Sequence, residues 1–494
     1  MTSANTVERE PASAGTAAAS LSANALAVTA ARLLVPALNL ALVVGIARLG
    51  GVESLGSYTV LVTLFLILEN VKTLGLTSML VRDVAADAHA ALAVYSSLVR
   101  ISLIGAVLCV PIMVGGATFA NGVHPASVLP ASIMAFGLFP SAYALVNDAL
   151  FLALGRARYS TAIALGENLL RLTASLVIVF LFHGGILWLA AIYAFTRMAA
   201  AAAGHWVIRN RLHLRPPKAC MKMIGETLRQ APAFLTIFVS PIVLFKMDVV
   251  LLGIVRGDYE AGIYGAAARL LSVCLILPDG FLTASFATLS RLLGSGALLA
   301  FRELIERTIQ GLGAGLTGVA ALGCVAGRFF LVGLYGHEFS SAVPLLELLL
   351  WSLTPFAINR ALGDALVAQG RQDLLARIVL AGTAASIVLY LVLIHFFGSI
   401  GAAWAFLLSS TLFCCISAIF VCRRLDIARL APVIRTMGVA IVGLGASLLP
   451  DSAVRLGLLL LVMTIGFSDF ALVLRPWLGT IRRRRNHTAD AAGY

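Results

Sequence analysis

Apolar runs of about 20 residues recur along the whole 494-residue chain, and no other feature limits its fold as strongly. The lipid interior offers no water to peptide groups, so each membrane-crossing segment must be a helix that satisfies its own backbone hydrogen bonds. Only 12% of the residues are charged and the mean hydropathy is +0.98, which excludes a soluble globular protein of this length. We therefore predict an all-α polytopic membrane protein with about fourteen transmembrane helices. Their expected bounds are 23–47, 57–80, 99–120, 127–153, 160–182, 186–208, 232–254, 261–289, 309–333, 341–368, 375–397, 400–421, 433–449 and 454–474.

The distribution of positive charge sets the expected topology. Lys and Arg gather in the two tails and in every second connection, and the segment 209–229 is especially rich in them. Because basic residues are retained on the cytoplasmic side, we predict that both termini lie in the cytoplasm of a bacterial inner membrane. The net charge of +13 then requires no nucleic-acid partner. The run from Arg482 to Arg485 is interpreted as a topology anchor beside anionic membrane lipids.

Several short patterns occur twice, in the same order and at a nearly constant offset. PSAYALVNDALFLALGRARY begins at Pro140 and PFAINRALGDALVAQGRQDL begins at Pro355, and both carry Gly-Arg at the same place. GIAR at 45–48 is followed by GSY, and GIVR at 253–256 is followed by GIY. We infer two parallel six-helix repeats, an arrangement in which transporters commonly place the substrate path between the repeats. The predicted organisation is a flexible cytoplasmic tail (1–22), a first lobe (23–208), a basic cytoplasmic linker (209–231), a second lobe (232–421), two further helices (422–474) and a basic cytoplasmic tail (475–494).

The stretch ARLGGVESLGSYTVLVTLFLILENVKTLGLTSMLVRDVA, from Ala47, resembles the polysaccharide-biosynthesis flippases of the multidrug/oligosaccharidyl-lipid/polysaccharide exporter superfamily. DVVLLG at 248–253, GIYGAA at 262–267 and the Gly-Arg pair at 155–156 extend the resemblance, which covers roughly residues 22–425. It implies two lobes around a central cavity that opens to either side of the membrane in turn. It also implies a cargo of undecaprenyl-pyrophosphate-linked oligosaccharide, flipped from cytoplasm to periplasm for surface polysaccharide, and a complex with polysaccharide polymerase and export machinery.

Charged side chains inside the predicted spans are the candidate functional residues, because each costs roughly 2.5–3.5 kcal/mol at mid-bilayer unless it is paired or wet. A pyrophosphate needs fixed cations in a partly dehydrated space. We predict that Arg32, Lys72, Lys246 and Arg269 form this cationic patch. A membrane carboxylate can bind a coupling proton or sodium ion, and the candidates for this role are Asp148, Glu167, Asp248 and Asp364.

Helical spacing also predicts structural ion pairs within single spans. Glu69 and Lys72 are three residues apart and Glu167 and Arg171 are four apart, so each pair shares a helix face. Glu347 and Asp469 are interpreted as structural or interfacial, and Pro36 as a static kink or a bend that lets the lobes rock.

Three other classes of protein compete with this interpretation. A multidrug/cation antiporter of the same superfamily needs acidic cavities, whereas the first span here offers Arg32 and no carboxylate. A peptidoglycan-precursor flippase is not separable by motif. An enzyme is disfavoured because the predicted periplasmic connections are short and the histidines are scattered. No Cys/His cluster has metal-ligand spacing, and no cofactor is predicted.

Overall fold

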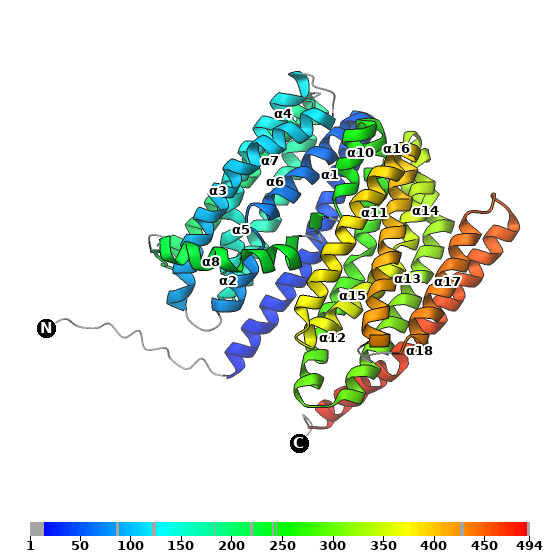
Figure 1. The fold of residues 1–494 in the computed structure, drawn as a ribbon. Helices are drawn as coiled ribbons and strands as arrows, with labels where there is room; N and C mark the ends of the chain where they lie inside the picture. The colour runs from blue at the N-terminus through cyan, green and yellow to red at the C-terminus, as the bar shows by residue number, and fades with distance from the viewer. Residues whose placement is uncertain are drawn as a thin grey trace.

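The computed structural model describes residues 14–84, 88–120, 125–182, 184–217, 221–239, 242–243, 245–424 and 429–491, and every regular element in these residues is helical (Figure 1). Residues 1–13 of the predicted tail, and the side chains of Arg32 and of Arg482 to Arg485, lie outside the described part. The first helix begins at Ala14, earlier than the predicted boundary at residue 23. Its first turns are rich in alanine, which is the best helix former, so helix continues into part of the segment predicted to be flexible.

The chain folds into two groups of helices joined by a short connecting region. The first half consists of α1 (Ala14–Val71), α2 (Thr77–Val84), α3 (Ala88–Ala120), α4 (Pro125–Phe136), α5 (Leu138–Ala153), α6 (Ala157–Phe182) and α7 (Ile186–Trp206). The connection contains η1 (Val207–Arg211), α8 (Met221–Phe234) and η2 (Leu235–Val239). The second half consists of α10 (Met247–Arg256), α11 (Asp258–Cys274), α12 (Ile276–Gly294), α13 (Leu298–Tyr335), η3 (His337–Ala342), α14 (Val343–Trp351), α15 (Leu353–Ala368), α16 (Gln372–Ala418) and η4 (Ile419–Arg424). Two further helices follow, α17 (Ala431–Ser447) and α18 (Ala453–Ala491).

Each predicted span falls on one to three of these helices, and the long helices do not each equal one span. Within the described residues, nine helices are long and apolar enough to cross a membrane, or ten if α11 and α12, bent by 41°, count as one span. This number of membrane-crossing helices is below the prediction of about fourteen spans. Part of the difference arises because α1 and α16 each cover two predicted spans. These are joined at Gly51 (φ 77°) and Gly398 (φ 59°), where only glycine adopts the required backbone readily. The exact number of crossings stays a prediction.

The sequence repeat coincides with a repeat in backbone geometry. After α5, Gly155 has φ 67° and the Arg156 N–H donates to the Phe151 carbonyl at 2.8 Å. After α15, Gly370 has φ 72° and the Arg371 N–H donates to the Leu366 carbonyl at 3.0 Å. Both ends are Schellman caps, in which a left-handed glycine lets the helix satisfy its last carbonyls. The duplicated Gly-Arg pair therefore stops the two equivalent helices in the same way.

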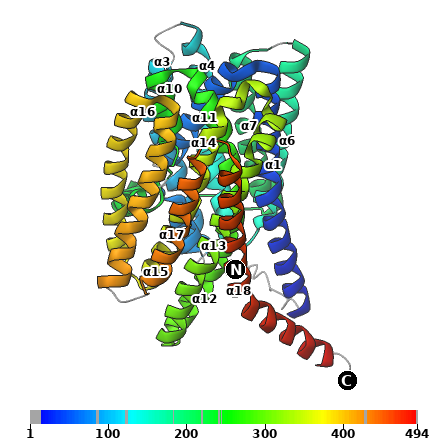
Figure 2. The same cartoon turned by 90° about the vertical axis from the view of Figure 1, so that its right-hand side faces the viewer.

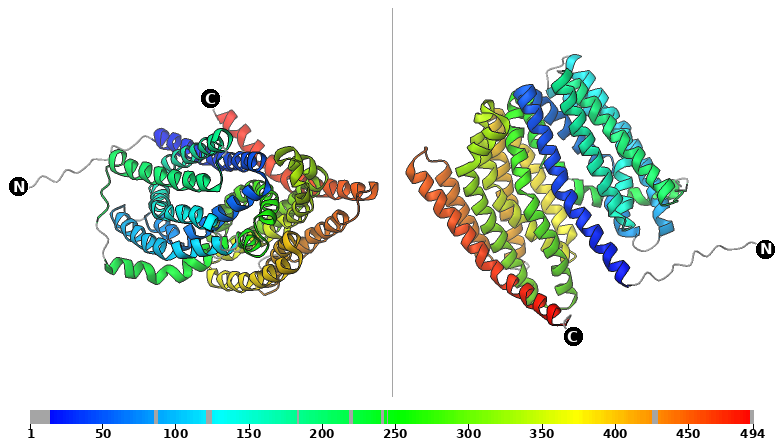
Figure 3. Two further views of the ribbon diagram at one scale, coloured as in Figure 1. Left: turned by 90° about the horizontal axis from the view of Figure 1, so that it is seen from above. Right: turned by 180° about the vertical axis from the view of Figure 1, so that it is seen from behind.

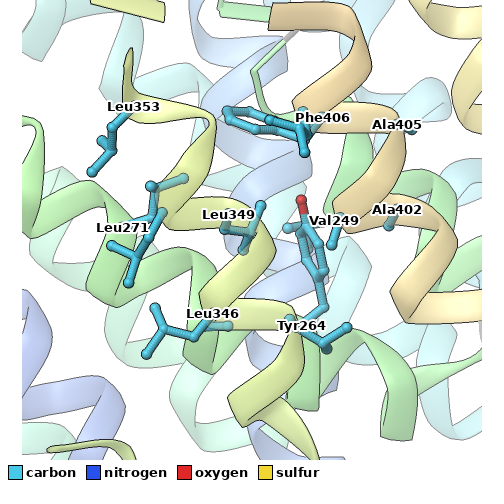
Figure 4. Close-up of a cluster of buried hydrophobic side chains, with 14 of the residues drawn as sticks. Val249, Tyr264, Leu271, Leu346, Leu349, Leu353, Ala402, Ala405 and Phe406 are labelled. Carbon is cyan, nitrogen blue, oxygen red and sulfur yellow. The ribbon is translucent and has the colours of Figure 1, made fainter. Parts of the chain in front are cut away.

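The helices of the two halves gather on opposite sides of the molecule in Figure 1, and α1 passes between them (Figure 3, right). The start of α1 and the end of α18 lie at the same end of the bundle (Figure 1). Both α17 and α18 pack along α13 at the outer edge of the second half (Figure 2). In the core of this half, the buried Tyr264 of α11 lies among Val249, Leu349 and Phe406 from three other helices (Figure 4).

Candidate functional site

A cavity of about 360 Å³ opens among α1, α5, α6, α7 and α11. Its lining comes mainly from the first half, and Arg269 of α11 is contributed by the second half. The other charged side chains of the lining are Asp148, Glu167, Arg171 and Arg197. Its amide and hydroxyl side chains are Asn39, Tyr58, Asn147, Ser160, Asn168 and Tyr193. The cavity is therefore polar, and it presents charge and neutral hydrogen-bonding groups together.

A buried ion network braces one wall of this cavity. Arg197 of α7 bonds Glu69 of α1 at 3.1 Å and Glu167 of α6 at 3.4 Å. Glu167 also pairs with Arg171, one turn along the same helix. The Arg171 guanidinium lies 4.0 Å from the centre of the Tyr193 ring, where a cation–π contact is favourable. Two carboxylates and two guanidinium groups thus neutralise one another across three helices of the first half.

The four predicted cations lie in different environments. Arg269 lines the cavity, and no hydrogen bond or ion pair joins it to any described residue. Lys246 is half-buried, and no hydrogen bond or ion pair joins its side chain to another described residue; it lies near enough to Arg269 to be repelled and near enough to Asp248 to be attracted. Lys72 is buried, and its ammonium donates to Ser141 and to the Leu138 carbonyl of α5. The structure therefore brings Arg269 to the cavity and holds Lys72 in a helix–helix contact, while the side chain of Arg32 is not described.

The four predicted ion-coupling carboxylates are also dispersed. Glu167 belongs to the ion network, and Asp148 accepts a hydrogen bond from Ser160 at the cavity wall. Asp248 is buried in the second half and accepts hydrogen bonds from the Tyr264 hydroxyl at 2.6 Å and the Val249 N–H at 2.8 Å. Asp364 pairs with Arg360, one turn earlier in α15, at 3.3 Å. Within the described residues, no group of three or more His, Cys, Asp or Glu side chains could hold a metal ion.

One of the two ion pairs predicted from helical spacing is present and the other is wrong. Glu167 and Arg171 pair as expected. Glu69 does not pair with Lys72, although the Lys72 N–H still donates to the Leu68 carbonyl at 2.9 Å, as in a helix. The Lys72 ammonium instead donates to Ser141 and to the Leu138 carbonyl of α5, and Glu69 bonds Arg197 of α7.

Sequence reasoning missed the main organiser of the cavity. Arg197 was recognisable as a charged residue inside a predicted span, but no local pattern connects it to Glu69, which lies far away in the sequence. The sequence also did not show that Asn39 and Asn168 would meet, and their side chains hydrogen-bond at 3.0 Å. Their only signal was the presence of a polar amide within an apolar span.

Glu347 and Asp469, the two carboxylates interpreted as structural or interfacial, each bond an arginine through both of their oxygens. Arg455 of α18 bonds both oxygens of Glu347 at 2.6 and 2.7 Å, and Arg435 of α17 bonds both oxygens of Asp469 at 2.9 and 2.7 Å. These pairs join α18 to α14 and to α17, and neither contributes to the cavity.

The two halves meet closely where α1 reverses direction and α11 begins. Gly56 of α1 and Gly262 of α11 face each other, so that a Cβ added to Gly262 would lie 2.2 Å from the Val52 carbonyl oxygen. The Ser57 hydroxyl donates to Asp258 across the same contact. Close by, the Arg48 Nε donates to the Leu334 carbonyl of α13 at 2.7 Å. The duplicated Gly-x-Tyr patterns of the sequence are thus the two surfaces of one interface.

Comparison with known proteins places this geometry in a family. The model of the family described as polysaccharide biosynthesis protein matches residues 21–293. A protein of Haloferax volcanii named "Probable flippase AglR" is 31% identical over 173 residues, a match that covers 34% of this chain and 35% of that protein, so the chain spans about a third of this relative's length.

Two solved structures share the fold. An inward-facing multidrug resistance MATE family transporter superposes with a TM-score of 0.67 at 13% identity, over 81% of this chain and 98% of that one. The lipid II flippase MurJ, in an inward closed conformation, also gives 0.67 at 13% identity, over 93% and 99% of the two chains. These structures show the fold alone, whereas the family match extends over more than half of the sequence; the chain belongs to the polysaccharide biosynthesis protein family.

Proposed function

We propose that this protein is a membrane flippase that carries lipid-linked oligosaccharide across a bacterial cytoplasmic membrane. The cargo is an undecaprenyl-pyrophosphate-linked repeat unit destined for surface polysaccharide. The family match and the relative named as a probable flippase support this class of cargo. The shared fold with MATE and MurJ transporters supports a mechanism in which one cavity opens to the two sides in turn.

The proposal rests on a positive charge in the cavity, that of Arg269, which has no counter-ion among the described residues. Glu167 is bonded to two arginines and Asp148 to a serine hydroxyl, so both carboxylates have partners. Arg269 has none among the described residues. A guanidinium without a counter-ion in a partly dehydrated space favours an anionic ligand, and its planar donors suit the oxygens of a diphosphate. Lys246 lies near Arg269 but does not line the cavity.

The neutral part of the lining suits the sugar portion of such a cargo. Asn39 and Asn168 are half-buried and line the cavity with amide groups, whereas Asn147, Tyr58 and Tyr193 are buried beside them. Sugar hydroxyls both donate and accept hydrogen bonds, and an amide side chain can also donate through its nitrogen and accept through its oxygen. We assign the sugar to the wall formed by the first half and the diphosphate to Arg269. The predicted coupling by proton or sodium remains part of this proposal, with Asp148 and Glu167 placed at the cavity and Asp248 and Asp364 in the second half.

The test is transport by purified protein in sealed vesicles. Undecaprenyl-diphosphate-linked oligosaccharide is placed in the outer leaflet of proteoliposomes, and its loss from that leaflet is followed with a membrane-impermeant glycosidase. We expect flipping by the unaltered protein and at least a tenfold loss in Arg269→Gln, about 1.4 kcal/mol of binding free energy. Arg371→Gln is the matched control, because Arg371 is exposed beyond the end of α15, away from the cavity.

One result would overturn the proposal, and a second would remove its assignment of Arg269. Unaltered protein that does not flip this lipid, yet moves a cationic drug across the same vesicles, would identify a multidrug transporter. Equal flipping by Arg269→Gln and Arg371→Gln would leave the flippase class standing but remove Arg269 from the diphosphate site.

A further inference from the structure

The connection between the two halves contains an amphipathic helix that crosses the direction of its neighbours. Figure 1 shows α8 running across α3 and α5 near their lower ends, instead of along them. One face of α8 packs against α3, and Ile224, Thr227 and Ala231 are buried there. These positions recur at the spacing of a single helix face. Outside this face, exposed side chains include those of Met221, Lys222, Leu228 and Arg229.

The free surface of α8 divides into an apolar strip and a basic strip. Met221 and Leu228 are 76% and 41% exposed and lie seven residues apart, so they share a face. Lys222 and Arg229 are both exposed and also lie seven residues apart, about 100° further round the helix. Going round the helix, a surface toward the protein is followed by an apolar strip and then by a basic strip. A helix at a membrane surface requires this order, because its apolar side chains enter the acyl region while its cations stay among the headgroups.

The segment that leads into α8 continues the basic character. Arg209, Arg211 and Arg215 are exposed, and no ion pair joins them or the two basic residues of α8 to any other described residue. Arg211 lies 5.6 Å from the ring centre of Trp206, whose side chain is half exposed. Tryptophan beside arginine is typical of the membrane–water interface. Between Val207 and Phe234 the only carboxylate is that of Glu226, so the charge of this surface is strongly positive.

We propose that this surface, formed by residues 206–215 and the outer face of α8, is a docking site for anionic phospholipid headgroups. It holds the connection between the two halves on the membrane surface. Retention of basic residues in the cytoplasm would explain why this surface is positive. It would not require Met221 and Leu228 to form an exposed apolar strip beside the basic residues. The proposal is independent of the cargo, since none of these residues lines the cavity.

The experiment measures amide exchange of α8 in the full-length protein reconstituted into two kinds of nanodisc. One contains phosphatidylcholine alone and the other an equimolar mixture with phosphatidylglycerol. We expect slower exchange of α8 in the mixture. Each basic side chain near an anionic surface strengthens binding about fivefold, so R215Q/K222Q/R229Q should reduce the docking equilibrium by about a hundredfold. The matched control is R291Q/R371Q/R377Q, which removes the same charge from exposed positions of the second half.

The possible results separate the proposal from its competitors. Slowing that depends on phosphatidylglycerol and is lost only in R215Q/K222Q/R229Q supports it. Equal exchange in the two nanodiscs, or equal loss in the control variant, overturns it and leaves the basic residues as topology signals. Slowing that appears only when undecaprenyl diphosphate is added would also overturn it, because the occupant would then be the cargo. If the triple variant does not insert, R215K/R229K must retain the effect, whereas M221Q/L228Q must weaken α8 docking in both nanodiscs.

Discussion

Replacing Gly262 with alanine should force the two halves apart where α1 and α11 cross. The added Cβ would lie 2.2 Å from the Val52 carbonyl oxygen and 3.1 Å from the Gly56 nitrogen. The reciprocal change, Gly56→Ala, would place a Cβ 1.8 Å from the Asp258 carbonyl oxygen. Both obstacles are backbone atoms, so no side-chain rotation relieves them. One of the two helices must move.

The size of the effect follows from the kind of contact. Overpacking a well-fitted site costs typically about 1–3 kcal/mol. The contact joins elements of different halves, so the molecule can relieve it by opening this end of the bundle without unfolding either half. At about 1.4 kcal/mol for each factor of ten, the balance between closed and open forms of this end should shift roughly 5- to 150-fold toward the open form.

The shift can be measured by electron paramagnetic resonance between two nitroxide labels. Suitable positions are Trp188 at the start of α7 and Phe397 at the bend in α16, which are 55% and 62% exposed and belong to different halves. We expect longer distances in Gly262→Ala than in the unaltered protein. Gly166→Ala is the control, because no atom lies within 4 Å of a Cβ added there. Unchanged distances together with a lowered melting temperature would refute the reasoning, since the strain would then be released by unfolding.

Three further substitutions test the other contacts, two by thermal melting of the purified protein and one by the vesicle assay together with melting. Arg197→Gln leaves Glu69 buried without its partner, at an expected cost of about 3–5 kcal/mol, and Glu69→Gln in the same chain should recover part of it. Arg455→Gln should cost about 1–3 kcal/mol by removing the bidentate partner of Glu347, and restoration by Glu347→Gln is the check. Lys72→Met should keep cargo flipping in the vesicle assay, because Lys72 is bound to polar groups of α5; loss of flipping with unchanged melting would return Lys72 to the cargo site.

Most of the helical framework could be predicted because its causes are local. A run of apolar residues long enough to cross a bilayer has few alternatives to helix. The duplicated Gly-Arg pairs stop α5 and α15 because a left-handed glycine is a local requirement of the cap. The bounds of the separate helices were harder to predict, since the chain turns at Gly51 and at Gly398 through a single residue with non-helical φ and ψ.

The cavity could be predicted only in its composition. Charged residues within the spans indicated a polar interior, but their partners come from helices that are distant in the sequence, as with Glu69 and Arg197. Helical periodicity supplied one correct pair, Glu167 and Arg171, where the helix is continuous. It failed at Lys72, whose ammonium bonds polar groups of α5 instead of Glu69. Pairing across helices depends on how the helices pack, and no spacing rule within one segment contains that information.

The location of the ion network bears on how the halves could move. Glu69, Glu167, Arg171 and Arg197 all belong to α1, α6 and α7, so the network does not cross between the halves. Breaking a buried ion pair by separating its partners costs several kcal/mol. The polar contacts that cross between the halves near Gly51 are hydrogen bonds to partly exposed groups, which water can replace when they open, and apolar packing of α1 on α11 accompanies them. A movement that separates the halves while each keeps its own ion pairs therefore avoids the cost of breaking this network, which favours rigid-body rocking as the motion for the proposed alternating exposure of the cavity.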